Sequence, residues 1–133
     1  METIRILLDT SAYIAFLKGH PGIKQAIQKA DEINLNPVVM GELLAGFVKG
    51  RRAPQNREIL QEFMGSPRVR LMAIDEETSE RYAAIFNYLR GKGAPIPTND
   101  LWIAATAMQF GLRVVTTDRH FQKIPQVMAE IHE

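Results

Sequence analysis

Four acidic residues lie in segments where a carboxylate is costly unless something binds it. The segment from 97 to 111, PTNDLWIAATAMQFG, reads as a helix that is apolar on nearly every face, yet Asp100 stands at its start. A buried carboxylate needs a helix cap, an ion pair or a cation beside it. The same choice arises at Asp9, Glu42 and Asp118.

Each acid also has an ordinary structural interpretation. Asp9, Asp100 and Asp118 could cap a helix or a turn, because aspartate is favoured at both places. Glu42 fits a solvated position less well, since helical spacing puts it on one face with small and apolar residues. Asp75 ends a strand too, but the helix beyond it is rich in exposed charge, so we interpret Asp75 as a plain cap.

The elements that must position these acids alternate between strand and helix. Strands are predicted at 4–9, 33–37, 69–74 and 113–117. Helices are predicted at 10–19, 21–30, 38–50, from about 57 to 64, 76–91 and 99–110, with a short helical turn at 118–123. This alternation predicts an α/β fold, with a parallel sheet and helices on both of its faces, in one domain over residues 1–133.

Such a fold gives the four acids a place to meet. The carboxyl end of each strand and the amino end of the next helix lie on the same edge of the sheet. The helix 99–110 rises roughly 18 Å and the strand 112–117 returns roughly 20 Å. Asp118 therefore comes back level with Asp100, and Asp9 and Glu42 should share the same edge.

Four carboxylates on one edge predict a divalent cation. Two carboxylates about 5 Å apart repel by roughly 3 kcal/mol at an effective dielectric of 20, so the group stays ionised only with a cation in it. Carboxylate oxygens suit the hard ions Mg²⁺ and Mn²⁺. Such an ion can polarise a phosphodiester and activate a water molecule. Phosphodiester hydrolysis is the reaction that this pattern favours.

Length and composition set limits on the other possibilities. The chain has 133 residues, of which 46% are hydrophobic and 23% are charged, as in a globular protein. It has no cysteine, so disulfides and thiolate metal sites are excluded. No apolar run reaches the length of a membrane span. The first residues lack the pattern of a signal peptide, and we expect a cytoplasmic location.

The charge balance is compatible with RNA. Setting the four acids aside from the 15 acidic residues leaves 11 to face 16 basic ones. A basic surface can hold phosphates, although single lysines and arginines at helix ends are more often only solvated. The candidates for phosphate binding are Lys49–Arg52, Arg57, Arg68, Arg70 and Arg90–Lys92.

Several apolar and aromatic residues are interpreted as structural. Trp102, Met108 and Phe110 belong to an apolar helix and are predicted to lie in the core, not to stack on bases. His120 could contact a phosphate or the acidic edge, but we interpret it as a surface histidine. Four residues of the first helix could pack in the core or line a dimer or partner groove: Tyr13, Ile14, Phe16 and Leu17.

Four short motifs resemble those of a known family. LLDTS near residue 9, VVMGELLAG near 40, TNDLWIAATA near 100 and VVTTD near 115 resemble, in order, the acidic motifs of PIN-domain ribonucleases. The likeness covers essentially the whole chain and is strongest to small VapC-like toxins of type II toxin–antitoxin systems. It implies a PIN-like three-layer fold with a mainly parallel sheet of about four to five strands.

The resemblance also implies a role for each matching residue. Asp9 and Asp100 would be the chief ligands of Mg²⁺ or Mn²⁺, and Asp118 a ligand directly or through water. Glu42 would position or deprotonate the attacking water. Nearby hydroxyls would orient the carboxylates, and which of the two late threonines points inward depends on the pleat of the strand. These hydroxyl residues are Thr10, Ser11, Thr116 and Thr117.

The activity implied is that of a metal-dependent endoribonuclease leaving a 5′-phosphate and a 3′-hydroxyl. Such proteins usually form homodimers and act as toxins, each bound by an antitoxin whose tail covers the acidic site. The alternative is a non-catalytic PIN module that binds RNA or a protein partner. A phosphoacceptor module is disfavoured because no second acid adjoins Asp9, and an Asp-x-Asp phosphatase because position 11 is serine.

Overall fold

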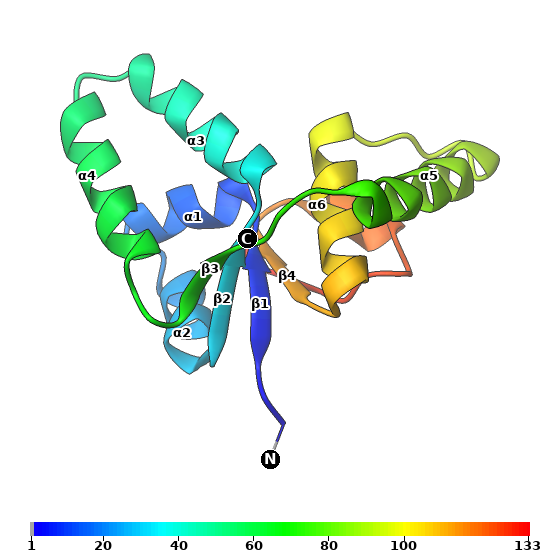
Figure 1. The fold of residues 1–133 in the computed structure, drawn as a ribbon, viewed down its shortest axis with the longest axis horizontal. Helices are drawn as coiled ribbons and strands as arrows, with labels where there is room; N and C mark the ends of the chain where they lie inside the picture. The colour runs from blue at the N-terminus through cyan, green and yellow to red at the C-terminus, as the bar shows by residue number, and fades with distance from the viewer. Residues whose placement is uncertain (1) are drawn as a thin grey trace.

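A five-stranded parallel sheet forms the centre of the computed structural model, which describes residues 2–133 (Figure 1). The strands are β1 (Arg5–Leu8), β2 (Glu32–Leu35), β3 (Val69–Leu71), β4 (Arg113–Thr116) and β5 (Ala129–Ile131). Their order is β3-β2-β1-β4-β5, and every neighbouring pair is parallel. The central strand β1 is covered on both faces, which explains its continuous apolar run. The predicted fold class is confirmed.

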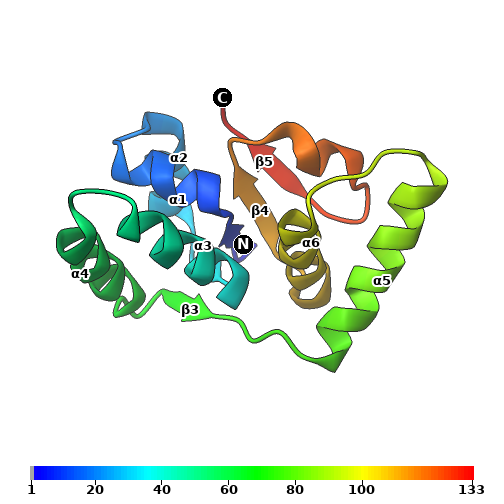
Figure 2. The same ribbon diagram turned by 90° about the horizontal axis from the view of Figure 1, so that it is seen from above.

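Helices fill the connections between these strands. They are α1 (Thr10–Leu17), α2 (Pro21–Lys29), α3 (Pro37–Val48), α4 (Ala53–Met64), α5 (Glu76–Gly91) and α6 (Thr98–Phe110), with a 3₁₀ helix η1 (Arg119–Lys123). Figures 1 and 2 show α1 to α4 on one side of the sheet and α5 and α6 on the other. None of the helices in the described part of the chain has the length and apolarity needed to cross a membrane.

The main differences from the predicted elements lie at the sheet edges. The short strand β5 pairs with β4 but was not predicted, because its three residues are only partly buried and show no alternation. Strand β3 ends at Leu71, three residues earlier than predicted. Beyond it the chain leaves the sheet and crosses to α5 on the other side (Figure 2). Helix α4 begins earlier than predicted, since Pro54 is tolerated in its first turn.

The core prediction for α6 is only partly correct. Leu101, Ile103 and Ala104 are buried, but Trp102, Met108 and Phe110 are half-buried. The reason is that α6 packs along α5, itself an outer helix with an exposed side. The Trp102 ring stacks on Tyr82 of α5, with ring centroids 4.2 Å apart.

The residues left open on α1 divide between core and surface. Tyr13 is fully buried and packs edge-on against Phe63 of α4, with ring centroids 5.3 Å apart. Phe16 is partly buried and packs against the same core. Ile14 and Leu17 line an open groove that α1 forms with α3 and α4. Helix α1 therefore contributes both to the core and to a surface groove.

A buried asparagine fixes α3 against α6. Asn36 is fully buried, and its Oδ1 accepts a hydrogen bond of 3.0 Å from the backbone N of Val39, which caps α3. Its Nδ2 donates to Oγ1 of Thr106 on α6 at 3.0 Å. The start of α3, the helix that carries Glu42, is thereby held to the second half of α6, the helix that carries Asp100.

Candidate active site

The first acid, Asp9, is held by a set of short hydrogen bonds. Its Oδ1 accepts from the backbone N of Ala12 at 2.8 Å and from Oγ of Ser11 at 2.7 Å. Its Oδ2 accepts from Oγ1 of Thr116 at 2.5 Å. Asp9 is only 3% exposed and caps α1. Its carboxylate is therefore fixed in direction before any ligand binds.

Thr116 connects the first acid to the fourth. Besides donating to Asp9, its Oγ1 accepts a hydrogen bond of 2.8 Å from the backbone N of Asp118. This decides which of the two late threonines points inward, a question that the sequence left open. Thr117 contributes through its backbone N, which donates to Oγ of Ser11 at 3.1 Å.

Glu42 is held by one side chain from each of two other helices. Oγ1 of Thr10 on α1 donates to its Oε1 at 2.6 Å, and Nδ2 of Asn99 on α6 donates to its Oε2 at 3.1 Å. The role of Asn99 was missed by the sequence analysis. The available signal was a second polar residue in the first turn of the helix that carries Asp100.

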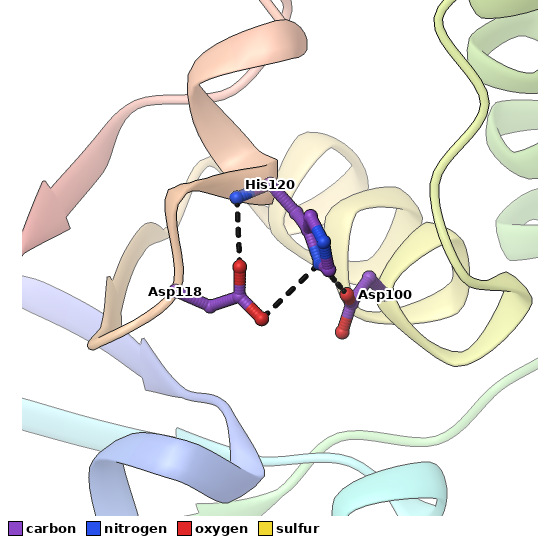
Figure 3. Close-up of side chains that lie close together, drawn as sticks. All are labelled: Asp100, Asp118 and His120. Atoms are coloured by element: carbon purple, nitrogen blue, oxygen red, sulfur yellow. Dashed lines mark hydrogen bonds and ion pairs between the residues drawn. The ribbon is translucent and has the colours of Figure 1, made fainter.

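Asp100 is not a helix cap. Helix α6 begins at Thr98 after Pro97, and no side chain caps it. Instead, Oδ2 of Asp100 lies 2.9 Å from Nδ1 of His120. The same nitrogen lies 3.1 Å from Oδ2 of Asp118, so the imidazole stands between the two acids (Figure 3). Of the three interpretations offered for this acid, the helix cap is wrong, and the partner that the structure shows is His120.

The interpretation of His120 as a simple surface histidine was also wrong. Its side chain is 38% exposed, yet it faces Asp100 on α6 and Asp118 at the end of β4. The 3₁₀ helix η1 begins directly after Asp118, whose Oδ1 accepts from the backbone N of His120 at 2.9 Å. A histidine two residues after a strand-end acid was the signal available in the sequence.

The electrostatics show that the four acids act on one another. Burial raises the pKa of Asp9, and the charge of Asp100 raises it further. Burial likewise raises the pKa of Asp100, and the charges of Asp118 and Glu42 add to the effect. Both carboxyls are thus less easily ionised than free aspartate, mainly because burial disfavours the charged form and, to a smaller extent, because like charges lie nearby.

This donor set fits a divalent cation. Asp100, Asp118 and His120 each offer one ligand atom, and these atoms lie within 4.8 Å of one another. Asp9 and Glu42 add carboxylates to the same charge cluster. A hard cation would stabilise the ionised forms of these carboxyls, which burial and the neighbouring negative charges disfavour.

Asp75 provides the expected contrast. Its Oδ1 accepts from the backbone N of Thr78 at 3.2 Å, its own backbone N donates to Thr78 Oγ1 at 3.0 Å, and the pair caps α5. The bond from Thr78 is the main cause that lowers the pKa of Asp75. The prediction of a plain cap is confirmed, and the direction of its pKa shift is opposite to that of Asp9 and Asp100.

The basic candidates do not all remain available to phosphates. The guanidinium of Arg68 donates to the backbone carbonyls of Ile27 and Ala30 at 3.1 and 2.6 Å, so its predicted role is corrected to a structural one. Arg70 lies 3.7 Å from a carboxylate oxygen of Glu32. In contrast, Arg52 lines a groove of about 420 Å³ that also includes Glu42.

The raised pKa values predict that Asp9 and Asp100 each reduce the stability of the ion-free protein as the pH rises. The folded state holds protons on Asp9 and Asp100 more tightly than the unfolded chain does, so the free energy of unfolding should fall above the ordinary carboxyl value of 3.8. Urea titrations with a chelator between pH 4 and 7 would measure this slope. Excess Mg²⁺ or Mn²⁺ should restore stability at pH 7. The wild type should lose more stability over this range than Asp100→Asn, which lacks one of the two titrating groups, and equal profiles for the two proteins would contradict the prediction.

Replacing Thr116 by valine should impair the site without unfolding the chain. Valine keeps the shape but removes the hydroxyl that links Asp9 to the backbone of Asp118, and loss of such a support typically costs about 10–100-fold in metal affinity or activity. Calorimetric titration with Mn²⁺ measures the affinity. The matched control is Thr117→Val, because Thr117 takes part through its backbone N. Equal losses in both variants would contradict this assignment.

The chain is similar to known proteins over nearly its whole length. A family profile described as PIN domain matches residues 6–127. Ribonuclease VapC4 of Mycobacterium tuberculosis is 30% identical over 132 residues, which cover 96% of each chain. Ribonuclease VapC of Rickettsia bellii is 30% identical over 125 residues, 92% of each chain.

Solved structures of the same architecture were also found. FitAcB from Neisseria gonorrhoeae superposes with a TM-score of 0.77 at 26% identity, covering 93% of this chain and 95% of that one. VapBC-5 from Mycobacterium tuberculosis, described as a member of a family of toxin–antitoxin systems, has a TM-score of 0.72 at 26% identity and covers 95% of both chains.

Proposed function

This chain belongs to the PIN-domain family, and we propose that it is a divalent-metal-dependent endoribonuclease and the toxin of a toxin–antitoxin pair. Residues 1–133 act as one PIN domain in this proposal. The observation that carries it is the set of contacts that links the four acids at one edge of the sheet. Thr116 joins Asp9 to the backbone of Asp118, and His120 lies between Asp118 and Asp100. Asn99, next to Asp100 in the chain, donates to Glu42. The ribonucleases among the relatives support RNA as the substrate.

The acids divide into ion ligands and a base. Mg²⁺ or Mn²⁺, held by Asp9, Asp100 and Asp118, would polarise the phosphodiester and neutralise the charge that develops on it. Glu42 orients the attacking water and takes its proton. Its two oxygens are steered by Thr10 and by Asn99, so the carboxylate keeps a defined direction.

The products follow from the direction of attack. Water attacks the phosphorus atom, the bond from phosphorus to the 3′ oxygen breaks, and that oxygen receives a proton as the 3′-hydroxyl. The phosphate remains on the 5′ carbon of the next nucleotide. Lys18 and Arg52, which line the groove beside Glu42, hold phosphates of the RNA strand outside the site of cleavage.

The partners are an antitoxin and a second copy of the chain. A solved relative is described as part of a toxin–antitoxin system, which supports the first. The groove lined by Ile14, Leu17 and Phe47 offers an apolar surface next to Glu42, where an antitoxin tail would cover the acids. The homodimer is proposed from the family resemblance, and the cytoplasm is the proposed location because RNA is the substrate.

Two experiments test this function. The purified chain should cut single-stranded RNA with Mg²⁺ or Mn²⁺ and stop when a chelator is added, and the products should carry 5′-phosphates. Expression should arrest growth in a way that the cognate antitoxin relieves. Undiminished cleavage in the chelator would exclude metal dependence, and RNA binding without cleavage under any ion would favour a non-catalytic PIN module.

A further inference from the structure

The imidazole of His120 lies where a further metal ligand would lie beside Asp100 and Asp118. Its Nδ1 is 2.9 Å from Oδ2 of Asp100 and 3.1 Å from Oδ2 of Asp118. Neighbouring ligands of an octahedral ion with bonds near 2.1 Å are about 3.0 Å apart, and opposite ligands about 4.2 Å. The donor atoms of Asp100, Asp118 and His120 all lie within 4.8 Å of one another, which is compatible with neighbouring and with opposite positions around one ion. The spacing is that of ligands around one ion.

The backbone holds this imidazole in position. Asp118 caps η1, and its Oδ1 accepts from the backbone N of His120, which leaves Oδ2 facing the ring. The following residue, Phe121, is 1% exposed and anchors η1 in the core. The side chains of Asp100 and Asp118 are 18% and 38% exposed, so an ion can reach them from solvent.

We propose that His120 supplies a nitrogen ligand to the ion of this site, and that the site therefore prefers Mn²⁺ to Mg²⁺. Mg²⁺ binds oxygen ligands and keeps several waters, whereas first-row transition ions also accept imidazole. Mn²⁺ shares the preference of Mg²⁺ for carboxylates, so it suits a mixed set of oxygens and one nitrogen. The inference rests on the proposed metal-dependent function and specifies its ligands.

The other role open to His120 is to orient the two carboxylates. In that case an Nδ1–H group would donate to Asp100 or Asp118 and would never touch the ion. The two roles differ in what replacement of the ring does. Loss of an orienting partner weakens all ions alike, whereas loss of a nitrogen ligand weakens Mn²⁺ more than Mg²⁺.

Pulsed electron paramagnetic resonance of the Mn²⁺-loaded chain tests the inference directly. The wild-type protein should show the ¹⁴N modulation of an imidazole bound to Mn²⁺, and this signal should disappear in His120→Asn. It should persist in His20→Asn, since His20 caps α2 through its ring nitrogen and asparagine is a good cap there. Calorimetry should show that His120→Asn loses at least about tenfold in Mn²⁺ affinity and less than about threefold in Mg²⁺ affinity.

Results that contradict the ligand role of His120 can be told apart from results that contradict the proposed function. Bound Mn²⁺ without ¹⁴N modulation in the wild type, or equal losses for both ions in His120→Asn, would overturn the ligand role and leave metal-dependent cleavage standing. If the wild-type chain binds neither Mn²⁺ nor Mg²⁺, the ligand role of His120 and the proposed metal-dependent function are both overturned. The wild-type spectrum is decisive even if the variant does not fold.

Discussion

Replacing Asp100 by asparagine should reduce RNA cleavage by at least about a thousandfold and should also stabilise the ion-free protein. The first effect follows because a bound ion provides several kcal/mol of transition-state stabilisation, and about 4 kcal/mol corresponds to a thousandfold in rate. The second follows because the pKa of Asp100 is raised, so its ionised form is disfavoured in the folded state. The amide removes that charge.

Two measurements and one control separate these effects. Cleavage of labelled RNA in Mn²⁺ gives the rate, and urea unfolding at pH 7 in a chelator gives the stability. The control is Asp75→Asn, the same change at a cap whose pKa is lowered, which should keep cleavage and gain no stability. An Asp100→Asn variant that retains more than about a tenth of the rate would remove Asp100 from the catalytic site.

The parallel α/β sheet and the strand-end acids were predictable from the sequence because they depend on local patterns. Buried strands such as β1 appear as continuous apolar runs, and parallel strands bring their carboxyl ends to one edge. An acid directly after such a run is therefore placed at that edge without knowledge of any contact. Asp9 and Asp118 illustrate this rule.

Thr10, Ser11 and Thr116 were named from the family resemblance and do contact the acids, but the rest of the supporting set was not predictable because it depends on contacts between distant segments. Asn99 reaches Glu42 across 57 positions of sequence, and its type alone equally suits a helix start. Whether Thr116 or Thr117 faces Asp9 depends on the register of β4 against β1, which a one-residue shift would reverse. His120 reaches Asp100 only because η1 turns back toward α6.

The half-buried state of Trp102, Met108 and Phe110 in α6 was also not predictable from the sequence. The segment of α6 is apolar on nearly every side, yet Trp102, which stacks on Tyr82 of α5, is only half-buried. A helix that packs on an outer helix buries less than one that packs on the sheet. The composition of α6 does not show whether one of its sides packs on another helix or on the sheet.

Replacing Glu42 by glutamine should separate chemistry from ion binding. Glutamine keeps the size of the side chain and an oxygen that can accept from Thr10, but it cannot take a proton from water. We expect the cleavage rate to fall by about 10²–10⁴-fold, the usual contribution of general base catalysis. Single-turnover cleavage measures this loss, and calorimetry should show Mn²⁺ affinity within a few-fold of wild type.

The comparison with Asp100→Asn gives this test its discriminating power, because an ion ligand and a base respond differently. Loss of the ligand should lower both affinity and rate, whereas loss of the base should lower the rate alone. Glu58→Gln, the same change at an exposed position of α4, serves as the control. If Glu42→Gln loses as much Mn²⁺ affinity as Asp100→Asn, then Glu42 binds the ion, and the proton of the attacking water must go to another group.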